Sequence, residues 1–386
     1  MTDLSYIPLG LYIHLPWCVQ KCPYCDFNSH ELRDPLPEKP YLNALIADLD
    51  NALPDIENRE VSSIFFGGGT PSLFTPKSIQ MLLTTISNKL TLNNNVEITL
   101  EANPGTIDAA RFTGYRDAGV NRLSLGIQSF NDKHLQALGR IHNAADALKA
   151  AESAANIFDN FNLDLMYGLA EQTPEEALAD VELAINTGAA HLSCYELTIE
   201  PNTVFYKHRP VLPDEEVLSA IEANVEGRLN DAGFNHYEVS AHARSGRKCR
   251  HNINYWSFGD YLGIGAGAHS KLTTLSGQQV PMIRREARVR IPQSYIDSAG
   301  SAHSITDQKY PGHDDLLFEF MLNALRLRQG FTLDLLTART GLTTDAARAG
   351  LAQASDRGLI TFNEDHVQPT QTGQRFLNDI IRSFLP

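Results

Sequence analysis

The chain has 386 residues, enough for one large α/β domain and a smaller one. Its hydrophobic content of 42% is ordinary for a folded protein, and its formal net charge of −14 argues against binding nucleic acid through a broad basic surface. No apolar run reaches the ~20 residues of a membrane span, and the first ten residues lack a basic region followed by an apolar one. We therefore expect a cytoplasmic protein.

The first half of the chain alternates short apolar runs with amphipathic helical patterns. Six strands are predicted, each followed by a helical segment: 9–15, 61–69, 96–104, 121–129, 161–169 and 191–198. One helix has a clear start, with Thr173 as N-cap, Pro174 in the first turn and Glu176 completing a capping box, and Gly188 follows its end. Repeated β–α units form parallel sheets with right-handed crossovers. The sequence thus predicts an α/β fold, with a partial (β/α)6 barrel over residues 1–235.

The next part of the chain has a weaker pattern. Residues 236–305 are expected to form a connecting segment. A helix precedes it, a strand is predicted at 234–240, and the Gly- and Tyr-rich stretch at 251–270 is expected to be irregular because it follows neither period.

Residues 306–386 form a third region with a different pattern. Three helical segments, a β-hairpin at 359–370 and a final helix predict a small winged-helix-like α+β domain. Its candidate recognition helix carries only Arg348 and Arg357 as basic residues. We therefore expect this domain to cover a protein or a substrate and not to bind DNA.

Three of the five cysteines, Cys18, Cys22 and Cys25, fall within eight residues directly after the first predicted strand. In a reducing compartment such a group indicates metal binding or catalysis more than disulfides. A zinc site would need a further ligand, for which His14 and His30 are candidates, since the sequence has no second C-x2-C pair. Three thiolates are also one fewer than normally hold a [4Fe–4S] cube, which would leave one iron open to a small chelating molecule.

The spacing C-x3-C-x2-C, with an aromatic residue before the last cysteine, resembles the radical S-adenosylmethionine (SAM) superfamily. The resemblance implies that the three cysteines hold a [4Fe–4S] cluster whose open iron chelates SAM. More narrowly, YIHLPWC, GGGTPS, EANPG, RLSLGIQSF, LGRIH and NLDLMYGL resemble the oxygen-independent coproporphyrinogen III oxidases and their relatives. By motif position, the resemblance implies that nine residues line the SAM site: Tyr12, Tyr24, Gly68, Gly69, Thr70, Glu101, Gln128, Arg140 and Asp164.

The chain departs from the oxidases of this family in two places. The oxidases carry a further cysteine where this chain has Phe27, and they have a long extension before the first strand, where this chain has about ten residues. A haem-chaperone branch of the family shares the phenylalanine, the short start and an H-N-x-x-Y-W motif, which here runs from His251 to Trp256. The resemblance to that branch implies a protein that binds haem and passes it to acceptors such as respiratory haem enzymes.

The chemistry of this motif fits haem. His251 can ligate iron as a neutral imidazole, and Tyr255 and Trp256 offer flat apolar faces to a macrocycle. Basic side chains suited to pairing with propionates lie in the same stretch: Arg247, Lys248 and Arg250. Cys249 is an alternative ligand, and the choice between it and His251 stays open. Decarboxylation of coproporphyrinogen III is the alternative activity, and a homodimer and peripheral membrane association also stay open.

Overall fold

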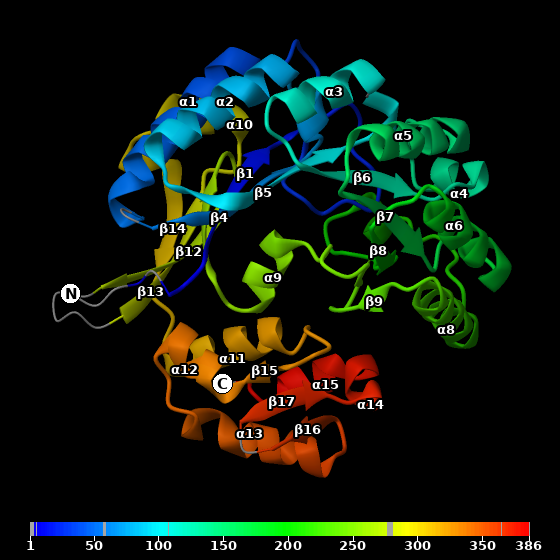
Figure 1. Cartoon of the computed structure of the whole chain (residues 1–386), viewed down its shortest axis with the longest axis vertical. Coiled ribbons are helices and arrows are strands. Elements are labelled where there is room, and N and C mark those ends of the chain that lie inside the picture. The colour runs from blue at the N-terminus through cyan, green and yellow to red at the C-terminus, as the bar shows by residue number, and fades with distance from the viewer. Residues whose placement is uncertain are drawn as a thin grey trace.

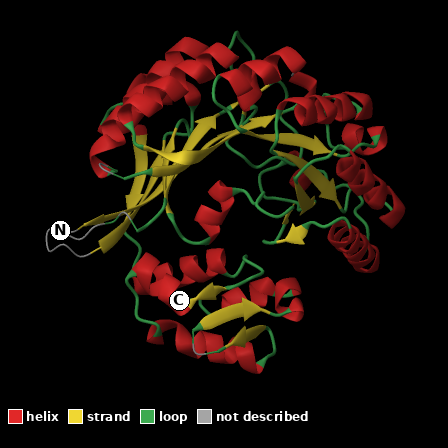
Figure 2. Ribbon diagram, in the orientation of Figure 1, coloured by secondary structure: helices red, strands yellow, loops and turns green. Residues whose placement is uncertain are grey.

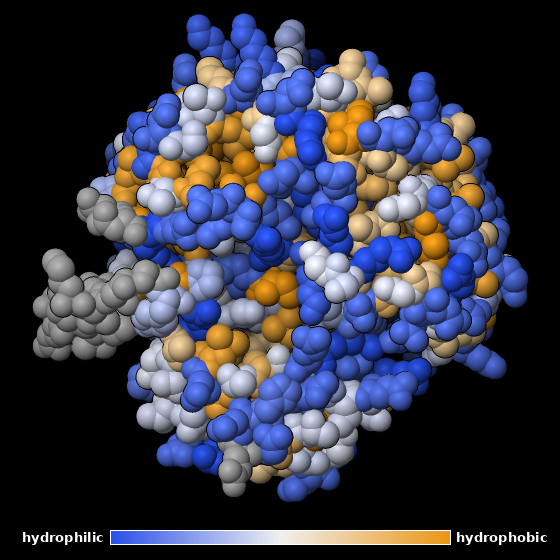
Figure 3. All heavy atoms as spheres, in the orientation of Figure 1, coloured by the Kyte–Doolittle hydropathy of each residue, from blue (hydrophilic) through white to orange (hydrophobic). Residues whose placement is uncertain are grey.

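Figure 1 shows the computed structural model of the chain, which describes residues 4, 6–56, 59–106, 108–275, 281–363 and 365–385. Within these ranges the main framework is one curved sheet of twelve strands, in the order β14-β13-β12-β11-β1-β4-β5-β6-β7-β8-β10-β9. Helices cover its outer side, and a C-terminal module lies beneath its inner side (Figures 1 and 2). The face drawn in Figure 3 is mostly hydrophilic, with scattered hydrophobic patches, one of the broadest toward its upper left.

The six strands predicted in the first half are all present. They are β1 (Leu9–Leu15), β4 (Val61–Gly68), β5 (Leu92–Ala102), β6 (Arg122–Gln128), β7 (Phe161–Tyr167) and β8 (His191–Glu196). Each pairs in parallel with the next. The connecting helices are α1 (Glu38–Ala52), α2 (Pro76–Lys89), α3 (Ala109–Asp117), α4 (Asp132–Ala137), α5 (Ala144–Ile157) and α6 (Pro174–Asn186). The predicted partial (β/α) barrel is confirmed.

Both ends of α6 carry the local signals that were predicted from the sequence. The Thr173 side chain accepts a hydrogen bond from the Glu176 amide, and the Glu176 side chain accepts one from the Thr173 amide at 3.0 Å. Gly188 follows the helix with a left-handed φ of 82°. The predicted capping box and glycine stop are therefore confirmed, and both are local signals that need no tertiary contact.

The predictions for residues 234–240 and 251–270 were wrong. After α7 (Val204–Lys207) and α8 (Glu215–Asp231), only β9 (Asn235–His236) lies within the strand predicted at 234–240, and it pairs antiparallel with β10 (Ala241–Ala243), which begins just after that range. The stretch expected to be irregular contains α9 (Arg250–Trp256), β11 (Asp260–Ile264) and the start of β12 (His269–Leu275). All five residues of β11 are buried, so the strand lacks the alternation that reveals a half-buried one.

Strand β11 lies parallel to β1 and extends the sheet beyond the predicted six strands. Strands β12, β13 (Pro281–Arg288) and β14 (Ile305–Lys309) continue it in antiparallel fashion. The segment between the barrel and the C-terminal module is thus largely part of the sheet. The predicted domain boundaries after residues 235 and 305 stay predictions. No helix of the described residues is both long and apolar enough to cross a membrane.

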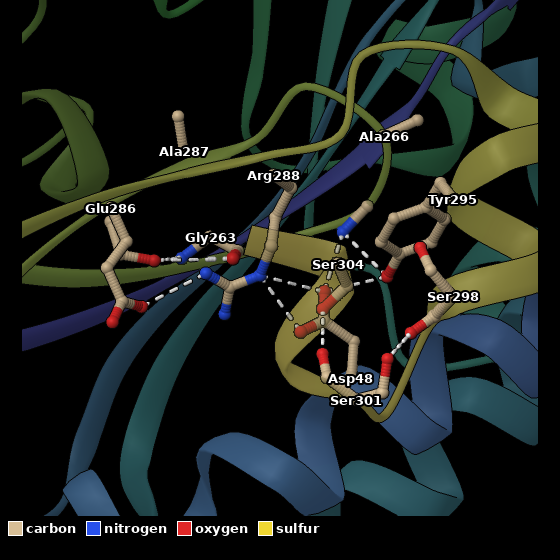
Figure 4. Close-up of polar contacts among 12 residues, drawn as sticks. Asp48, Gly263, Ala266, Glu286, Ala287, Arg288, Tyr295, Ser298, Ser301 and Ser304 are labelled. Carbon is tan, nitrogen blue, oxygen red and sulfur yellow. Dashed lines mark hydrogen bonds and ion pairs between the residues drawn. The ribbon is translucent and has the colours of Figure 1, made fainter. Parts of the chain in front are cut away.

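Buried ion pairs fasten this extension to the barrel. Arg288 of β13 donates to Asp48 of α1 at 2.9 Å and to Glu286 at 3.1 Å (Figure 4). Tyr295, on α10 (Pro292–Ser298), donates its hydroxyl to Asp48 at 2.7 Å and accepts from the Gly265 amide at 3.0 Å (Figure 4). Each charge in this cluster therefore has an opposite charge or hydrogen-bonding group beside it, as burial requires.

A second buried cluster ties β11 and β12 to the start of the chain. Asp260 accepts from Arg59 at 2.8 Å and from Lys271 at 2.8 Å. Attraction to these two cations outweighs the large effect of burial and lowers the pKa of Asp260, so its carboxylate stays charged.

The C-terminal module has its own hydrophobic core, which Phe258 and Ile283 of the preceding segment join. It comprises α11 (His313–Ala324), α12 (Leu333–Thr340), α13 (Asp345–Asp356), the sheet β15 (Phe331–Thr332)–β17 (His366–Pro369)–β16 (Ile360–Phe362), α14 (Gln371–Arg375) and α15 (Leu377–Arg382). The predicted three helices, hairpin and final helical segment are all present. Helix α9 lies between this module and the inner side of the sheet (Figure 1).

Candidate cofactor and ligand site

The three clustered cysteines lie on the loop after β1, at the carboxyl end of the parallel strands. Two short strands, β2 (Trp17–Cys18) and β3 (His30–Glu31), pair at the base of this loop. Asn28, within the loop, donates to the carbonyls of Ala266 and Arg290, both at 2.9 Å. Parallel sheets place ligand sites at this edge, and here the loop is held by residues far along the chain.

The loop after β4 closes against the cysteine loop. The Thr70 amide donates to the carbonyl of Trp17 at 2.7 Å. A Cβ atom added to Gly69 would lie 2.6 Å from that carbonyl oxygen, and Gly68 has a left-handed φ of 119°. Only glycine permits this approach and this backbone conformation without strain. The glycine pair therefore shapes the wall that faces the cysteines.

A cavity of about 170 Å³ joins these loops to the strand ends. Its walls contain all three cysteines and eight of the nine residues expected at the SAM site: Tyr24, Gly68, Gly69, Thr70, Glu101, Gln128, Arg140 and Asp164. Tyr12 lines a larger adjoining cavity of about 460 Å³, which shares Tyr24, Phe27 and Glu101 with the first. The structure thus brings together side chains separated by up to 146 positions in the sequence.

The cysteine side chains are suited to a shared metal group. Burial raises the pKa of Cys18 and Cys25, so both are thiols until a metal displaces their protons. The Cys25 sulfur lies 3.7 Å from the Ser29 hydroxyl, and Arg140 Nη1 donates to the Cys22 sulfur at 3.5 Å. Among the described residues no three potential ligands are close enough for a single ion.

His14 is not placed to complete a zinc site. Its Nε2 donates to the carbonyl of Asn28 at 2.9 Å, and its Nδ1 lies 3.0 Å from the Tyr12 hydroxyl. Both ring nitrogens therefore have partners in the wall. His30 Nε2 lies 3.3 Å from the Asn28 side chain.

Two buried carboxylates face the cavity. Burial, with a smaller contribution from Asp164, raises the pKa of Glu101 to about 8. Burial also raises the pKa of Asp164, although hydrogen bonds from Asn162 at 2.7 Å and Ser124 at 3.2 Å oppose the shift. Two such carboxylates together favour a positively charged or hydroxyl-bearing ligand. The ammonium group and ribose of SAM have this chemistry.

Arg140 and Gln128 complete the polar wall. Arg140 Nη2 donates to the carbonyl of Gly126 at 2.7 Å, which fixes its guanidinium beside the cysteines. Gln128 ends β6 with a left-handed φ of 69°, a conformation that costs energy for a residue with a Cβ and often marks a functional position.

The larger cavity combines an aromatic wall with a polar one. Its apolar residues are Tyr12, Tyr24, Phe27, Phe65, Met166, Tyr195, Tyr255 and Trp256, and its polar residues include Thr99, Arg122, Ser124, Asn162, Asp164, His191 and Ser193. Phe27 lines this cavity, the smaller one and a third of about 360 Å³, while 64% of its surface stays exposed. Phe27 thus lies where the three cavities meet.

Helix α9 carries the H-N-x-x-Y-W motif into this cavity. Glu97 Oε1 accepts from the amides of Arg250 at 2.9 Å and His251 at 3.4 Å, so a buried carboxylate binds the amino end of the helix. The Trp256 ring lies 4.2 Å from the guanidinium carbon of Arg326 in the C-terminal module.

The two candidate haem ligands differ in their surroundings. The His251 ring stacks on Phe65 with centroids 4.9 Å apart, its Nδ1 lies 3.2 Å from the Ser63 hydroxyl, and burial lowers its pKa to about 3. It is therefore a neutral imidazole. The Cys249 thiol donates to Glu97 at 3.6 Å, and burial with the nearby Glu97 charge raises its pKa to about 12. The electrostatics favour His251 over a Cys249 thiolate.

The basic residues expected to pair with haem propionates lie outside the larger cavity. None of the Arg247, Lys248 and Arg250 side chains lines the larger cavity. Lys248 donates to Gln329 at 3.4 Å. The cation in the cavity wall is Arg122, which we did not single out from the sequence. The only signal in the sequence was a charged residue at the second position of the strand predicted at 121–129.

Comparison with known proteins places this site in a family. Residues 12–184 match the radical SAM superfamily, and residues 312–376 match the HemN C-terminal domain. The haem chaperone HemW of Escherichia coli (strain K12) is 46% identical over 98% of both chains. The chain belongs to the HemW family. HemW of Haemophilus influenzae is likewise 46% identical over 98% of both chains, and HemW of Mycobacterium tuberculosis is 34% identical over 98% of this chain and 95% of its own.

A solved structure supports the fold of this HemW family member. The coproporphyrinogen III oxidase HemN from Escherichia coli, a radical SAM enzyme, matches with a TM-score of 0.81 at 23% identity. The match covers 98% of this chain and 90% of that one. The radical SAM architecture expected from the cysteine spacing is thereby confirmed.

Proposed function

We propose that this chain is a haem chaperone, which binds haem and transfers it to acceptor proteins. The observation that carries the proposal is the larger cavity, in which the neutral His251 imidazole lies beside the aromatic rings of Tyr255 and Trp256. Haem has a flat, apolar macrocycle that packs against aromatic rings and an iron that binds an axial ligand such as imidazole. The names of the relatives that cover nearly the whole chain support the same function.

We further propose that Cys18, Cys22 and Cys25 hold a [4Fe–4S] cluster and that SAM occupies the smaller cavity. When bound, such a cluster supplies single electrons and one open iron position. The chain's own residues orient the ligand: Glu101 and Asp164 accept from its ammonium or hydroxyl groups, and Arg140 stays beside the sulfurs. The thiols' raised pKa makes loading release protons, so loading improves at higher pH.

For the haem iron we favour His251 over Cys249. A neutral imidazole offers a lone pair at no protonation cost, whereas the Cys249 thiol would have to lose a strongly held proton beside Glu97. We infer that the protein works in the cytoplasm and that its acceptors are respiratory haem enzymes.

Haem titration of cluster-reconstituted protein tests the main proposal. We expect a shifted Soret band with saturable stoichiometry, and transfer of that haem to an apo-enzyme. His251→Ala should weaken the complex, whereas His303→Ala, a variant of an exposed histidine, should bind as wild type does. The proposal is wrong if wild-type protein shows no Soret shift or cannot deliver haem.

The alternative activity is oxidative decarboxylation of coproporphyrinogen III. The fold shared with the HemN oxidase favours it, and the presence of Phe27 in place of a cysteine argues against it. An anaerobic assay with coproporphyrinogen III, SAM and a reductant tests this activity. Formation of protoporphyrinogen IX would establish an oxidase, and absence of this product would rule that activity out.

A further inference from the structure

The larger cavity contains a buried cation that forms no ion pair with the described residues. Arg122, the first residue of β6, is 2% exposed and lines this cavity. The other buried lysine and arginine side chains of the described ranges each pair with carboxylates at 2.8 to 3.1 Å: Arg59, Lys271 and Arg288 (Figure 4 shows the last). Within those ranges no ion pair shorter than 4.0 Å involves Arg122. It is the exception among the buried cations.

The hydrogen bonds of Arg122 are also incomplete. Its Nη1 donates to Asn160 Oδ1 at 3.0 Å and to the carbonyl of Arg247 at 3.3 Å, and its buried Nε has no partner among the described residues. A guanidinium carries five N–H donors and a charge that is never lost in proteins. Burying it without an anion carries a large desolvation penalty. Such a group lining a cavity indicates that an anionic ligand completes it.

Strand register places Arg122 deep in the cavity. Arg122 lies opposite Thr99 of β5, and Ser124, two residues later on the same face, lies opposite Asn162 of β7. The cysteine loop, by contrast, lies at the carboxyl ends of these strands. A ligand that reaches Arg122 therefore extends inward from the aromatic residues near the cysteines.

The polar groups beside Arg122 leave its guanidinium available to a ligand in the cavity. His191 has both ring nitrogens within 2.8 Å of partners, Asn162 Oδ1 and the Tyr237 hydroxyl, and burial lowers its pKa, so it is neutral. Asp164 of the same wall accepts hydrogen bonds from Asn162 and Ser124, and although the Arg122 charge helps to hold down the pKa of Asp164, the two side chains form no ion pair within 4.0 Å. The polar part of the cavity wall therefore consists of hydrogen-bonding side chains around one cation, Arg122.

We propose that Arg122 binds a carboxylate of the cargo, namely a propionate of haem. The inference rests on the proposed chaperone function and adds the recognition of one end of the ligand. The macrocycle then lies among Phe27, Tyr255 and Trp256, and its acidic edge reaches the guanidinium through charge-assisted hydrogen bonds. The cavity matches haem in both respects: apolar and aromatic at one end, cationic at the other.

Binding of haem and of haem dimethyl ester, in which both propionates are esterified, tests this inference on the full-length reconstituted protein. Wild type should bind haem more tightly than the ester. Arg122→Met should weaken haem binding about 10- to 100-fold, the range for a lost charge-assisted hydrogen bond, and leave ester binding unchanged. Arg122→Lys should retain part of the preference for haem.

A second variant separates recognition from structural support. Asn160→Ala removes the side-chain acceptor of Arg122 but keeps the guanidinium, so it should retain the preference for haem over the ester. The inference is overturned if folded Arg122→Met protein binds haem as wild type does, or if Asn160→Ala loses the same preference. Failure of wild type to bind haem at all would instead overturn the chaperone function, and this inference with it.

Discussion

At the scale of single residues, the site depends on side chains whose ionisation is changed by burial. Glu101 is the clearest case, because its pKa moves from 4.5 to about 8. The folded chain then holds a proton that the unfolded chain releases. The stability of the protein without ligands therefore falls as the pH rises from about 4.5 to 8 and is constant above that range.

Glu101→Gln should remove this dependence. The amide keeps an acceptor for the Gly68 amide, which donates to Glu101 at 3.2 Å, but it carries no charge. At pH 8 the ligand-free variant should melt a few degrees higher than wild type, and near pH 5 the two curves should converge. Differential scanning fluorimetry across this pH range measures the effect. A variant that melts lower than wild type at pH 8 would contradict the assignment.

The three clustered cysteines give a second prediction at this scale. Cys18→Ala should lose the brown absorbance near ~400 nm and most of the about four irons per chain expected of a [4Fe–4S] cluster. Anaerobic iron and sulfide analysis after reconstitution measures this. Cys194→Ala is the matched control, because Cys194 is a buried cysteine that does not line the cavities beside the cluster loop. Full iron content in Cys18→Ala would refute the ligand assignment.

Residues differ in how well sequence reveals them. Cys18, Cys22 and Cys25 are close in the chain, so their spacing alone predicted a shared group. Arg122 could not be found this way, because its significance lies in its burial without an ion pair, which only tertiary structure shows. The expectation that Arg250 pairs with a propionate has the opposite difficulty. Arg250 is adjacent in sequence to the motif, but its side chain donates to the carbonyl of Asn95 and does not line the cavity.

At the scale of elements, α9 shows how a tertiary contact can decide secondary structure. Its residues include Asn, His, Tyr and Trp, none a strong helix former, and it has no side-chain N-cap. Glu97, about 150 residues earlier, accepts from its first amides instead. The sequence therefore predicted the six local β–α units well but missed this helix, because the group that stabilises it comes from another strand.

Glu97→Leu should accordingly loosen α9. Loss of this acceptor leaves buried amides unpaired and should lower the free energy of unfolding by ~1–3 kcal/mol. Urea denaturation followed by fluorescence measures it, since Trp256 on α9 is one of two tryptophans. Glu97→Gln, which keeps an acceptor oxygen, should be milder. Equal stability of Glu97→Leu and wild type would show that α9 is held by its other contacts.

At the scale of the whole molecule, Phe258 joins the sheet to the C-terminal module. It is 1% exposed, belongs to the module's core and packs edge-on against Phe320, with ring centroids 5.6 Å apart. Lys271 of β12 lies 4.5 Å over the same ring. One aromatic side chain thus contacts both parts, and the parts are expected to unfold together.

Phe258→Ala should uncouple them. Removal of a buried phenylalanine costs ~3–5 kcal/mol, and here the loss falls on the junction. Calorimetry should show two transitions in place of one, and limited proteolysis should release the C-terminal module. Phe376→Ala is the control, because Phe376 lies in the same module and is 53% exposed. A single transition with unchanged proteolysis would contradict this role.

The contacts of Asn28 have a consequence for biosynthesis. The cysteines leave the ribosome long before the carbonyls of Ala266 and Arg290, which hold their loop and emerge some 240 to 260 residues later. During translation the loop that carries the thiols therefore lacks its hydrogen bonds to Ala266 and Arg290. Iron and sulfide delivered to the nascent chain before that point would meet an incomplete pocket, so the ordered site becomes available for cluster assembly only after Arg290 has been made.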